Sequence, residues 1–254
     1  MNRSDNRQLV PGRLGVKGLR FPVKVRTKSG ELQSSIATVD VQARMPSEID
    51  WQGFNESGLM LADEKEGIDV RRFRPVLEKM QSKLGAASVK VKIKFPYFRE
   101  KAAPVSGAVS SMDYDCSFSG ILDTSGNWEL VVGVQVPVST VCPCSKEISE
   151  HGAHNQRGIV KLKFKPEGMI WLEDMLDLVE QSASCSLYAL LEDEDEKYCT
   201  ERAYDNPRFV EDLVREVALR LKVNRRIKWF LIEAENTESI HNHSAYAMIE
   251  MDNE

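Results

Sequence analysis

The sequence contains no apolar run long enough to span a bilayer, and its first 18 residues lack the apolar core of a signal peptide. The formal charge of −5 over 254 residues gives no reason to expect nucleic-acid binding through bulk electrostatics. Cysteine is scarce and odd in number, with five residues, which indicates reduced thiols rather than a disulfide framework. We therefore expect a cytoplasmic protein that contacts neither nucleic acid nor membrane, and any anionic substrate would have to be met by a local basic pocket.

What the chain does contain, 42% hydrophobic and 29% charged residues, is typical of a globular protein. Residues 89–95, VKVKIKF, alternate apolar residues with lysines, which predicts a strand with one buried and one solvated face. Further strands are predicted within 21–45 (two strands around a turn), 110–124, 127–140, 158–166, 228–236 and 244–251. Apolar residues at helical spacing predict helices at 73–84, 169–184 and 206–224, and Pro46 and Ser47 indicate that a short helix opens within 46–54.

Each half of the chain is therefore predicted to run strand, strand, helix, helix, strand, strand. We expect an α+β fold with a loose N-terminal arm at 1–18, a first module at 19–125 and a second module at 126–254. The second module carries most of the candidate site residues.

Two of the four histidines lie in VCPCSKEISEHGAHNQR, residues 141–157, together with Cys142 and Cys144. By spacing alone this cysteine pair is a poor zinc-finger signal because no second pair is present, and two buried thiols explain it equally well. The polar surroundings, which include His151 and His154, favour a functional loop between two strands. The other three cysteines are predicted to be packing residues: Cys116, Cys185 and Cys199.

The other two histidines lie in ESIHNHSA, at the predicted turn between the last two strands. His241 and His243 are two apart, so on an extended chain they point to the same face, and Glu238 lies nearby. Solvation at the surface is the alternative for any single histidine. Together, a thiolate, imidazoles and a carboxylate suit a catalytic zinc-type site with an open position for water.

Between the two clusters lies LEDEDEKYCTERAYDNPRFVED, whose acidic run at 192–196 is predicted to be a solvated loop. Glu211 is expected in the first turns of a helix capped by Asn206, where the helix dipole favours a carboxylate. Its two oxygens could accept paired hydrogen bonds from a planar donor. A surface ion pair with Arg215, one turn further along the helix, is the alternative.

The blocks CPCSKEIS, GAHNQR, EKYCTERAYDNPRFVED and ESIHNHSAYA resemble the signature blocks of the prokaryotic GTP cyclohydrolase IB family. The opening GVKGLRFPVKV is also similar, so the resemblance covers nearly the whole chain; Cys199 departs from it where an aliphatic residue is expected. The resemblance implies the tunnelling fold. In that fold two tandem ββααββ modules form antiparallel sheets with helices on one face, and the sheets assemble into barrels. It also implies a homotetramer with active sites at subunit interfaces.

The implied activity is conversion of GTP and water to 7,8-dihydroneopterin triphosphate and formate, the first step of folate biosynthesis. The implied metal ligands are Cys142, His154, Glu196 and His241, with Glu201 a nearby alternative for the carboxylate. Cys144 is implied as a second active-site thiol, and Glu211 as the carboxylate that anchors guanine.

This chemistry suits those residue types. Opening the guanine imidazole ring requires water to add at C8, and a divalent metal makes hydroxide available near neutral pH. His151 and His243 are candidates for moving the protons, since imidazoles titrate near operating pH. The basic residues that could hold the triphosphate are Lys146, Arg157, Lys197 and Arg202.

Two other functions compete with this hypothesis. A tunnelling-fold nitrile reductase acting on a deazaguanine would need a cysteine nucleophile and NADPH but no metal, so two histidine clusters disfavour it. A metal- or purine-binding module without turnover would leave Glu211 and its basic neighbours without a purpose. The mixed donor set suits zinc and also admits manganese or iron.

Overall fold

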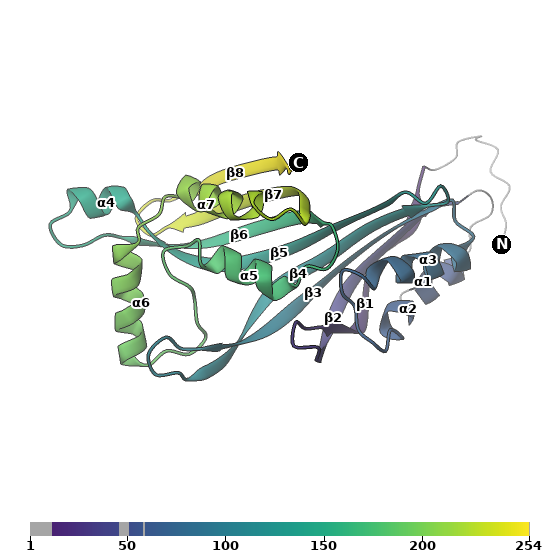
Figure 1. The fold of residues 1–254 in the computed structure, drawn as a ribbon, viewed down its shortest axis with the longest axis horizontal. Coiled ribbons are helices and arrows are strands. Elements are labelled where there is room, and N and C mark those ends of the chain that lie inside the picture. Colours follow the sequence, from purple (N-terminus) through teal and green to yellow (C-terminus); the bar gives the residue numbers. More distant parts are fainter. Residues whose placement is uncertain (1–11, 46–50, 58, 254) are drawn as a thin grey trace.

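The computed structural model describes residues 12–45, 51–57 and 59–253. The described strands form one antiparallel sheet in which every strand pairs with its neighbours in the sequence (Figure 1). The strands are β1 (Leu14–Arg26), β2 (Leu32–Arg44), β3 (Ser88–Ala102), β4 (Val109–Asp123), β5 (Trp128–Val141), β6 (Asn155–Pro166), β7 (Ile227–Glu238) and β8 (Ser244–Asp252). The predicted α+β class is confirmed.

The helices lie between strands in both halves of the chain. They are α1 (Trp51–Ser57), α2 (Leu59–Ala62), α3 (Phe73–Leu84), α4 (Pro143–Ile148), α5 (Leu172–Glu180), α6 (Asp193–Asp205) and α7 (Val210–Lys222). Each half therefore places helices between two strand pairs, as predicted, but contains more than two helices. In the second half α4 also interrupts the predicted strand pair.

Three local predictions are wrong. The acidic run at 192–196 is the start of α6 rather than a loop, and the Asp195 carboxylate holds this start by accepting from the Glu192 N–H at 3.0 Å. Asn206 ends α6 instead of capping α7, and its amide donates to the carbonyls of the 183–184 turn. Strand β1 begins at Leu14, inside the range expected for the arm, while residues 1–11 lie outside the described part.

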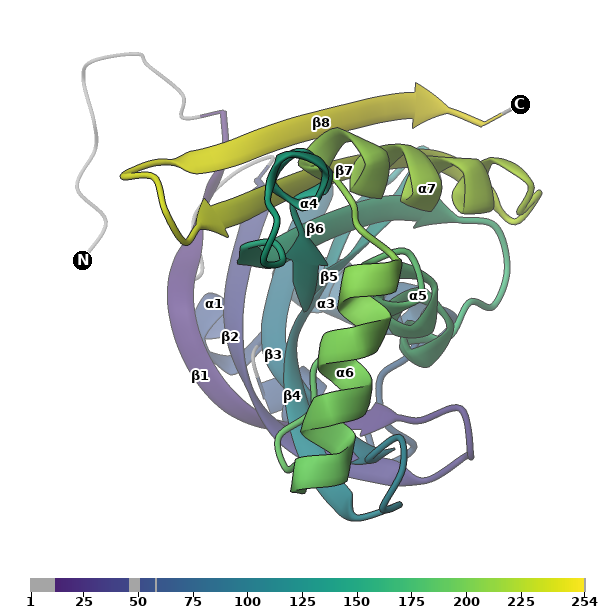
Figure 2. The ribbon, with the colours of Figure 1, turned by 90° about the vertical axis from the view of Figure 1, so that its left-hand side faces the viewer.

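The core lies between one face of the sheet and the helices, and Figure 2 shows the sheet curving around this layer. In β3 the predicted alternation holds: Val89, Val91, Ile93 and Phe95 are buried, and lysines occupy the other face. The apolar faces of α3, α5 and α7 pack on the buried side through residues spaced by three or four. A single apolar cluster joins the core residues of both halves, so burial does not stop at the predicted boundary near residue 125.

Polar contacts also join the two halves, between the β3–β4 hairpin and α5. Tyr97, Arg99 and Lys101 alternate along one face of β3 and meet three carboxylates on one face of α5. The pairs are Tyr97–Glu173, Arg99–Asp177 and Lys101–Glu180. Glu180 also accepts from the Tyr114 hydroxyl at 2.6 Å, and burial is the largest cause that raises the pKa of Tyr114, followed by this hydrogen bond.

The Lys101–Glu180 pair is almost fully buried, with side chains 9% and 5% exposed. Replacing Lys101 with methionine leaves a buried carboxylate without its cation, which typically costs about 3–5 kcal/mol. We expect the free energy of unfolding, measured by urea titration, to fall by about 3 kcal/mol. The control is Lys28→Met, whose pair with Asp174 is exposed and should change the free energy of unfolding far less. Equal losses of stability in the two variants would show that burial does not make the Lys101–Glu180 pair more important than the exposed Lys28–Asp174 pair.

Candidate functional site

The first histidine cluster lies where the β5–β6 ladder ends. Val141 and Asn155 are the last registered pair, and the ladder continues one step further, because the Cys142 N–H donates to the His154 carbonyl at 3.1 Å. Cys142 is the N-cap of α4. The Ser145 hydroxyl donates to the Cys142 carbonyl at 3.1 Å and accepts from the His154 N–H at 3.2 Å. Cys142 and His154 are therefore cross-strand neighbours, with Cβ atoms expected about 5 Å apart.

The second cluster reaches the same place through strand β7. Glu238, the last residue of β7, is in register with Gln156 on β6. Its Oε2 lies 3.8 Å from His154 Nδ1 and 4.0 Å from His241 Nδ1. The ring centroids of His154 and His241 are 6.4 Å apart, and those of His241 and His243 are 5.2 Å apart. Figures 1 and 2 place α4 and the β7–β8 turn at the same end of the sheet.

The side chains at this site differ in their exposure to solvent. The side chains of His154 and Glu238 are 12% and 10% exposed, whereas that of His241 is 51% exposed. Glu238 was noted near the histidines in the sequence but was not among the expected ligands. Its contact with both imidazoles depends on the β6–β7 register, which a single sequence does not display.

Of the expected metal set, the structure brings Cys142, His154 and His241 to one end of the sheet. Glu196 lies elsewhere, in the first turn of α6, whereas α4 contacts the end of that helix through the Lys146 ammonium and the Tyr204 carbonyl. Glu196 precedes Tyr204 by two turns, about 12 Å along the axis. Glu201, the alternative, faces Lys197 at 3.9 Å on the surface. In the described part of the chain, no three His, Cys, Asp or Glu side chains are grouped closely enough to hold a metal.

The start of α6 is held by the hairpin of the first half. Asp195 is fully buried and accepts from the N–H groups of Val105 and Ser106 and from the Ser106 hydroxyl. Burial raises the pKa of Asp195, but these hydrogen bonds and one from the Glu192 N–H outweigh it and hold that pKa well below its usual range. The position of Glu196 is therefore set by residues more than eighty positions earlier in the chain.

The remaining expected residues lie around the clusters. Cys144 is exposed on α4, and His151 is exposed in the loop that follows. The Lys146 ammonium lies 4.1 Å from the centre of the Tyr204 ring. As predicted, Cys116 and Cys185 are buried, and Cys199 packs against the small apolar cluster that contains Cys185.

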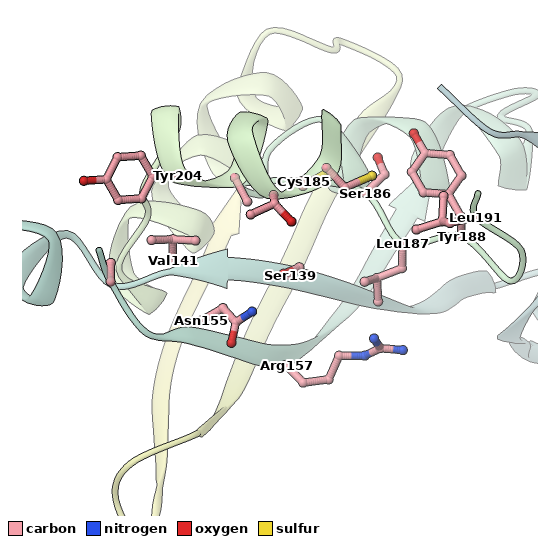
Figure 3. A pocket seen from close by; sticks show the side chains of 14 residues that line it. Ser139, Val141, Asn155, Arg157, Cys185, Ser186, Leu187, Tyr188, Leu191 and Tyr204 are labelled. Atoms are coloured by element: carbon pink, nitrogen blue, oxygen red, sulfur yellow. The ribbon is translucent and has the colours of Figure 1, made fainter. Parts of the chain in front are cut away.

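Arg157 does not face the histidines. In β6, Gln156 is buried and Arg157 is exposed, because successive strand residues point to opposite faces. Figure 3 shows Asn155 and Arg157 at a cavity of about 300 Å³, across from Tyr204 on α6. Arg202 lines a separate hollow of about 600 Å³ beside α6, and Lys197 is exposed.

Glu211 is exposed in the first turn of α7. Because α7 leads directly into β7 and packs along it, this first turn lies at the same end of the sheet as Glu238 (Figure 1). The alternative pairing is wrong: the Arg215 guanidinium contacts Asp212 at 3.2 Å, and the Asp212 carboxylate also accepts from the Phe209 N–H at 3.2 Å. The helix start is therefore stabilised by Asp212.

The sequence model of the family described as type I GTP cyclohydrolase folE2 matches residues 1–247. The chain belongs to this family. It is 43% identical over 249 residues to the GTP cyclohydrolase FolE2 of Syntrophobacter fumaroxidans, covering 98% of this chain and 97% of that protein. The FolE2 enzyme of Nitrosococcus oceani is 46% identical over 248 residues, with 98% and 92% covered. The expected GTP cyclohydrolase family is confirmed, and the finer label IB stays a prediction.

Solved structures with a similar fold include a uricase from Bacillus fastidious, with a TM-score of 0.59, 9% identity, and coverage of 96% of this chain and 93% of that one. Urate oxidase from Bacillus subtilis 168 gives a TM-score of 0.58 at 9% identity, with 94% and 98% covered. At this identity the likeness shows the fold alone, and it supports the predicted tunnelling-type fold. None of the described helices is both long and apolar enough to cross a bilayer.

Proposed function

We propose that the chain, as a type IB enzyme, converts GTP and water to 7,8-dihydroneopterin triphosphate and formate at the cluster of Cys142, His154, Glu238 and His241. GTP cyclohydrolase activity in folate biosynthesis follows from the family to which the chain belongs. The observation that carries the location is the approach of Glu238 Oε2 to within 3.8 and 4.0 Å of two imidazoles that are distant in the sequence.

The donor set at this cluster fits a divalent metal. His154 and His241, whose ring centres lie 6.4 Å apart, would supply imidazole nitrogens to the metal. Cys142 would supply a thiolate beside them. Glu196 remains our proposed carboxylate ligand, which requires a second copy of the chain or a movement of α6. Zinc, manganese and iron(II) all suit this set.

A bound metal would supply acidified water and charge stabilisation at C8 of guanine. The chain's own residues would move the protons. Glu238 Oε2 lies within 4.0 Å of Nδ1 of both His154 and His241, and the Ser239 hydroxyl lies 3.3 Å from the same His154 nitrogen. His243 extends this group at 5.2 Å from His241 and lies toward solvent, where it could exchange protons with water. His151 and Cys144 take no part in these contacts. We keep them as proposed catalytic residues that would have to move closer to the histidine cluster.

Substrate recognition is assigned to Glu211 and to the basic residues around the site. The exposed carboxylate of Glu211 can accept from guanine N1–H and the 2-amino group, a pair that adenine does not present. Lys146 lies nearest the cysteine loop and is the first candidate for the triphosphate. Arg157 points to the opposite face of β6 from Gln156, and Lys197 and Arg202 lie on α6, so these three residues would act across a subunit interface.

The test is to add GTP with zinc, manganese or iron(II) to metal-depleted protein and to measure formate and the fluorescent pterin product. Stoichiometric release of both supports the proposal. Consumption of NADPH with a nitrile-bearing deazaguanine, without formate, would support the reductase instead. Metal binding without turnover of either substrate would support a binding module that has no catalytic activity.

The next prediction concerns the oligomeric state of the protein. Strands β1 and β8 form the two edges of the sheet, and β8 exposes Tyr246 and Met248. Open edges of this length are normally paired or covered. We therefore expect a homotetramer in which these edges pair between subunits, close a barrel and complete each site. Sedimentation should give a stable tetramer, and a stable, active monomer would refute the assignment. Within the subunit we retain two tandem modules divided near residue 125, which corresponds to the β4–β5 turn.

A further inference from the structure

The buried faces of β5, β6 and β7 change character as they approach the site. Over most of their length these faces carry apolar residues such as Val136, Val160 and Ile232. At the site end they carry Thr140 and Gln156, which are 0% and 7% exposed, and Asn236 is likewise buried. Buried polar side chains are costly unless they are hydrogen-bonded, so their placement here calls for a reason.

These three residues form one directional chain of hydrogen bonds. The Asn236 amide donates to Thr140 Oγ1 at 3.0 Å, and the Thr140 hydroxyl donates to Gln156 Oε1 at 2.8 Å. Gln156 Nε2 in turn donates to Glu238 Oε1. Thr140 Oγ1 accepts from Asn236 and donates to Gln156 Oε1, which leaves the Gln156 NH2 group facing Glu238.

The two carboxylate oxygens of Glu238 therefore have different neighbours. Oε1 is held by the Gln156 amide, whereas Oε2 is the atom that lies 3.8 Å from His154 Nδ1 and 4.0 Å from His241 Nδ1. A carboxylate held at one oxygen cannot rotate freely, so the other oxygen stays aimed at both imidazoles.

The space for this arrangement is reserved by the sequence. Gly158 is in register with Asn236, and a Cβ at this glycine would meet Asn236 Oδ1 at 2.2 Å. A side chain here would push Asn236 away from Thr140 and break the first hydrogen bond. Glycine at position 158 is therefore needed for the hydrogen bond between Asn236 and Thr140.

We propose that Gln156 is a positioning residue for the reaction, oriented by Thr140 and Asn236, which aims Glu238 at His154 and His241. This inference rests on the proposed function of the histidine cluster. It assigns no contact with substrate to Gln156. Its effect is transmitted through the orientation of the carboxylate.

The decisive comparison is Thr140→Val against Thr140→Ser. Valine keeps the shape but removes the hydroxyl that orients the Gln156 amide, whereas serine keeps the hydroxyl. Losing such an outer hydrogen bond typically costs about 10–100-fold in activity or metal affinity. We expect Thr140→Val and Gln156→Glu to lower kcat by about that factor, with KM for GTP changed less than about twofold. Thr140→Ser should retain most of the wild-type kcat.

A second readout is the affinity for manganese or zinc, measured by competition with a chromophoric chelator. It should weaken by about tenfold or more in Thr140→Val and not in Thr140→Ser. The control is Gln135→Glu, an exposed glutamine on β5 away from the cluster, which should change neither quantity. Melting temperatures are measured for all variants.

A Thr140→Val protein with wild-type kcat and metal affinity but a lowered melting temperature would overturn the proposal. The hydrogen bonds among Asn236, Thr140 and Gln156 would then have only a structural role. Failure of the proposed function is distinguishable, since wild-type protein would then release no formate from GTP. The metal affinities of the valine and serine variants still decide the role of Gln156 in that case.

Discussion

Replacing Glu211 with glutamine should lower kcat/KM for GTP by on the order of a thousandfold or more, while metal content and melting temperature stay close to wild type. Glutamine keeps the size and helix position of Glu211 but turns one acceptor into a donor that opposes the guanine N–H groups. The start of α7 should be unaffected, because it is Asp212 that accepts from the Phe209 N–H and binds Arg215. Formate release, metal analysis and thermal melts measure the three quantities.

The matched control is Glu216→Gln on the same helix, where the carboxylate pairs with Arg220 at 2.9 Å. This i,i+4 pair should contribute only a few tenths of a kcal/mol to stability and nothing to turnover. A Glu211→Gln enzyme that turns over GTP at the wild-type rate would end the assignment of Glu211 as the guanine anchor. Loss of metal in that variant would instead place Glu211 among the ligands.

Replacing Cys142 or His154 with alanine is expected to remove the bound metal and the activity together in a folded protein. Both residues lie beyond the last registered pair of β5 and β6 and neither belongs to the apolar core, so the protein should stay folded. Loss of a ligand should exceed the roughly 10–100-fold effects of outer-shell changes. Metal content per chain, formate release and far-UV circular dichroism are the measurements.

Cys199→Ala is the control for these variants, because Cys199 packs against a small apolar cluster. It should keep metal and turnover. Full metal occupancy in either Cys142→Ala or His154→Ala would show that the ligand assignment is wrong, even if activity fell.

Alternation and helical spacing were sufficient to predict most strands and the helices α3, α5 and α7 from the sequence, because both patterns depend on burial of one face. Every second residue from Val89 to Phe95 is buried, and so is the stripe of α7 formed by Val210, Leu213, Val214, Val217 and Leu221, as those periods require. Local capping chemistry was harder to predict. Asn206 precedes a proline and resembles a helix start, yet it ends α6, because its amide reaches carbonyls about twenty residues earlier.

The residue types of the site were also evident in the sequence, since the four histidines fall into two short polar segments. Their contacts were decided by tertiary structure. The β5–β6 ladder places Cys142 opposite His154, and the β6–β7 register brings Glu238 beside Gln156. The same period of two turns Arg157 away from the histidines, although it is only three residues from His154. Strand register depends on pairing between distant segments, and a single sequence does not display that pairing.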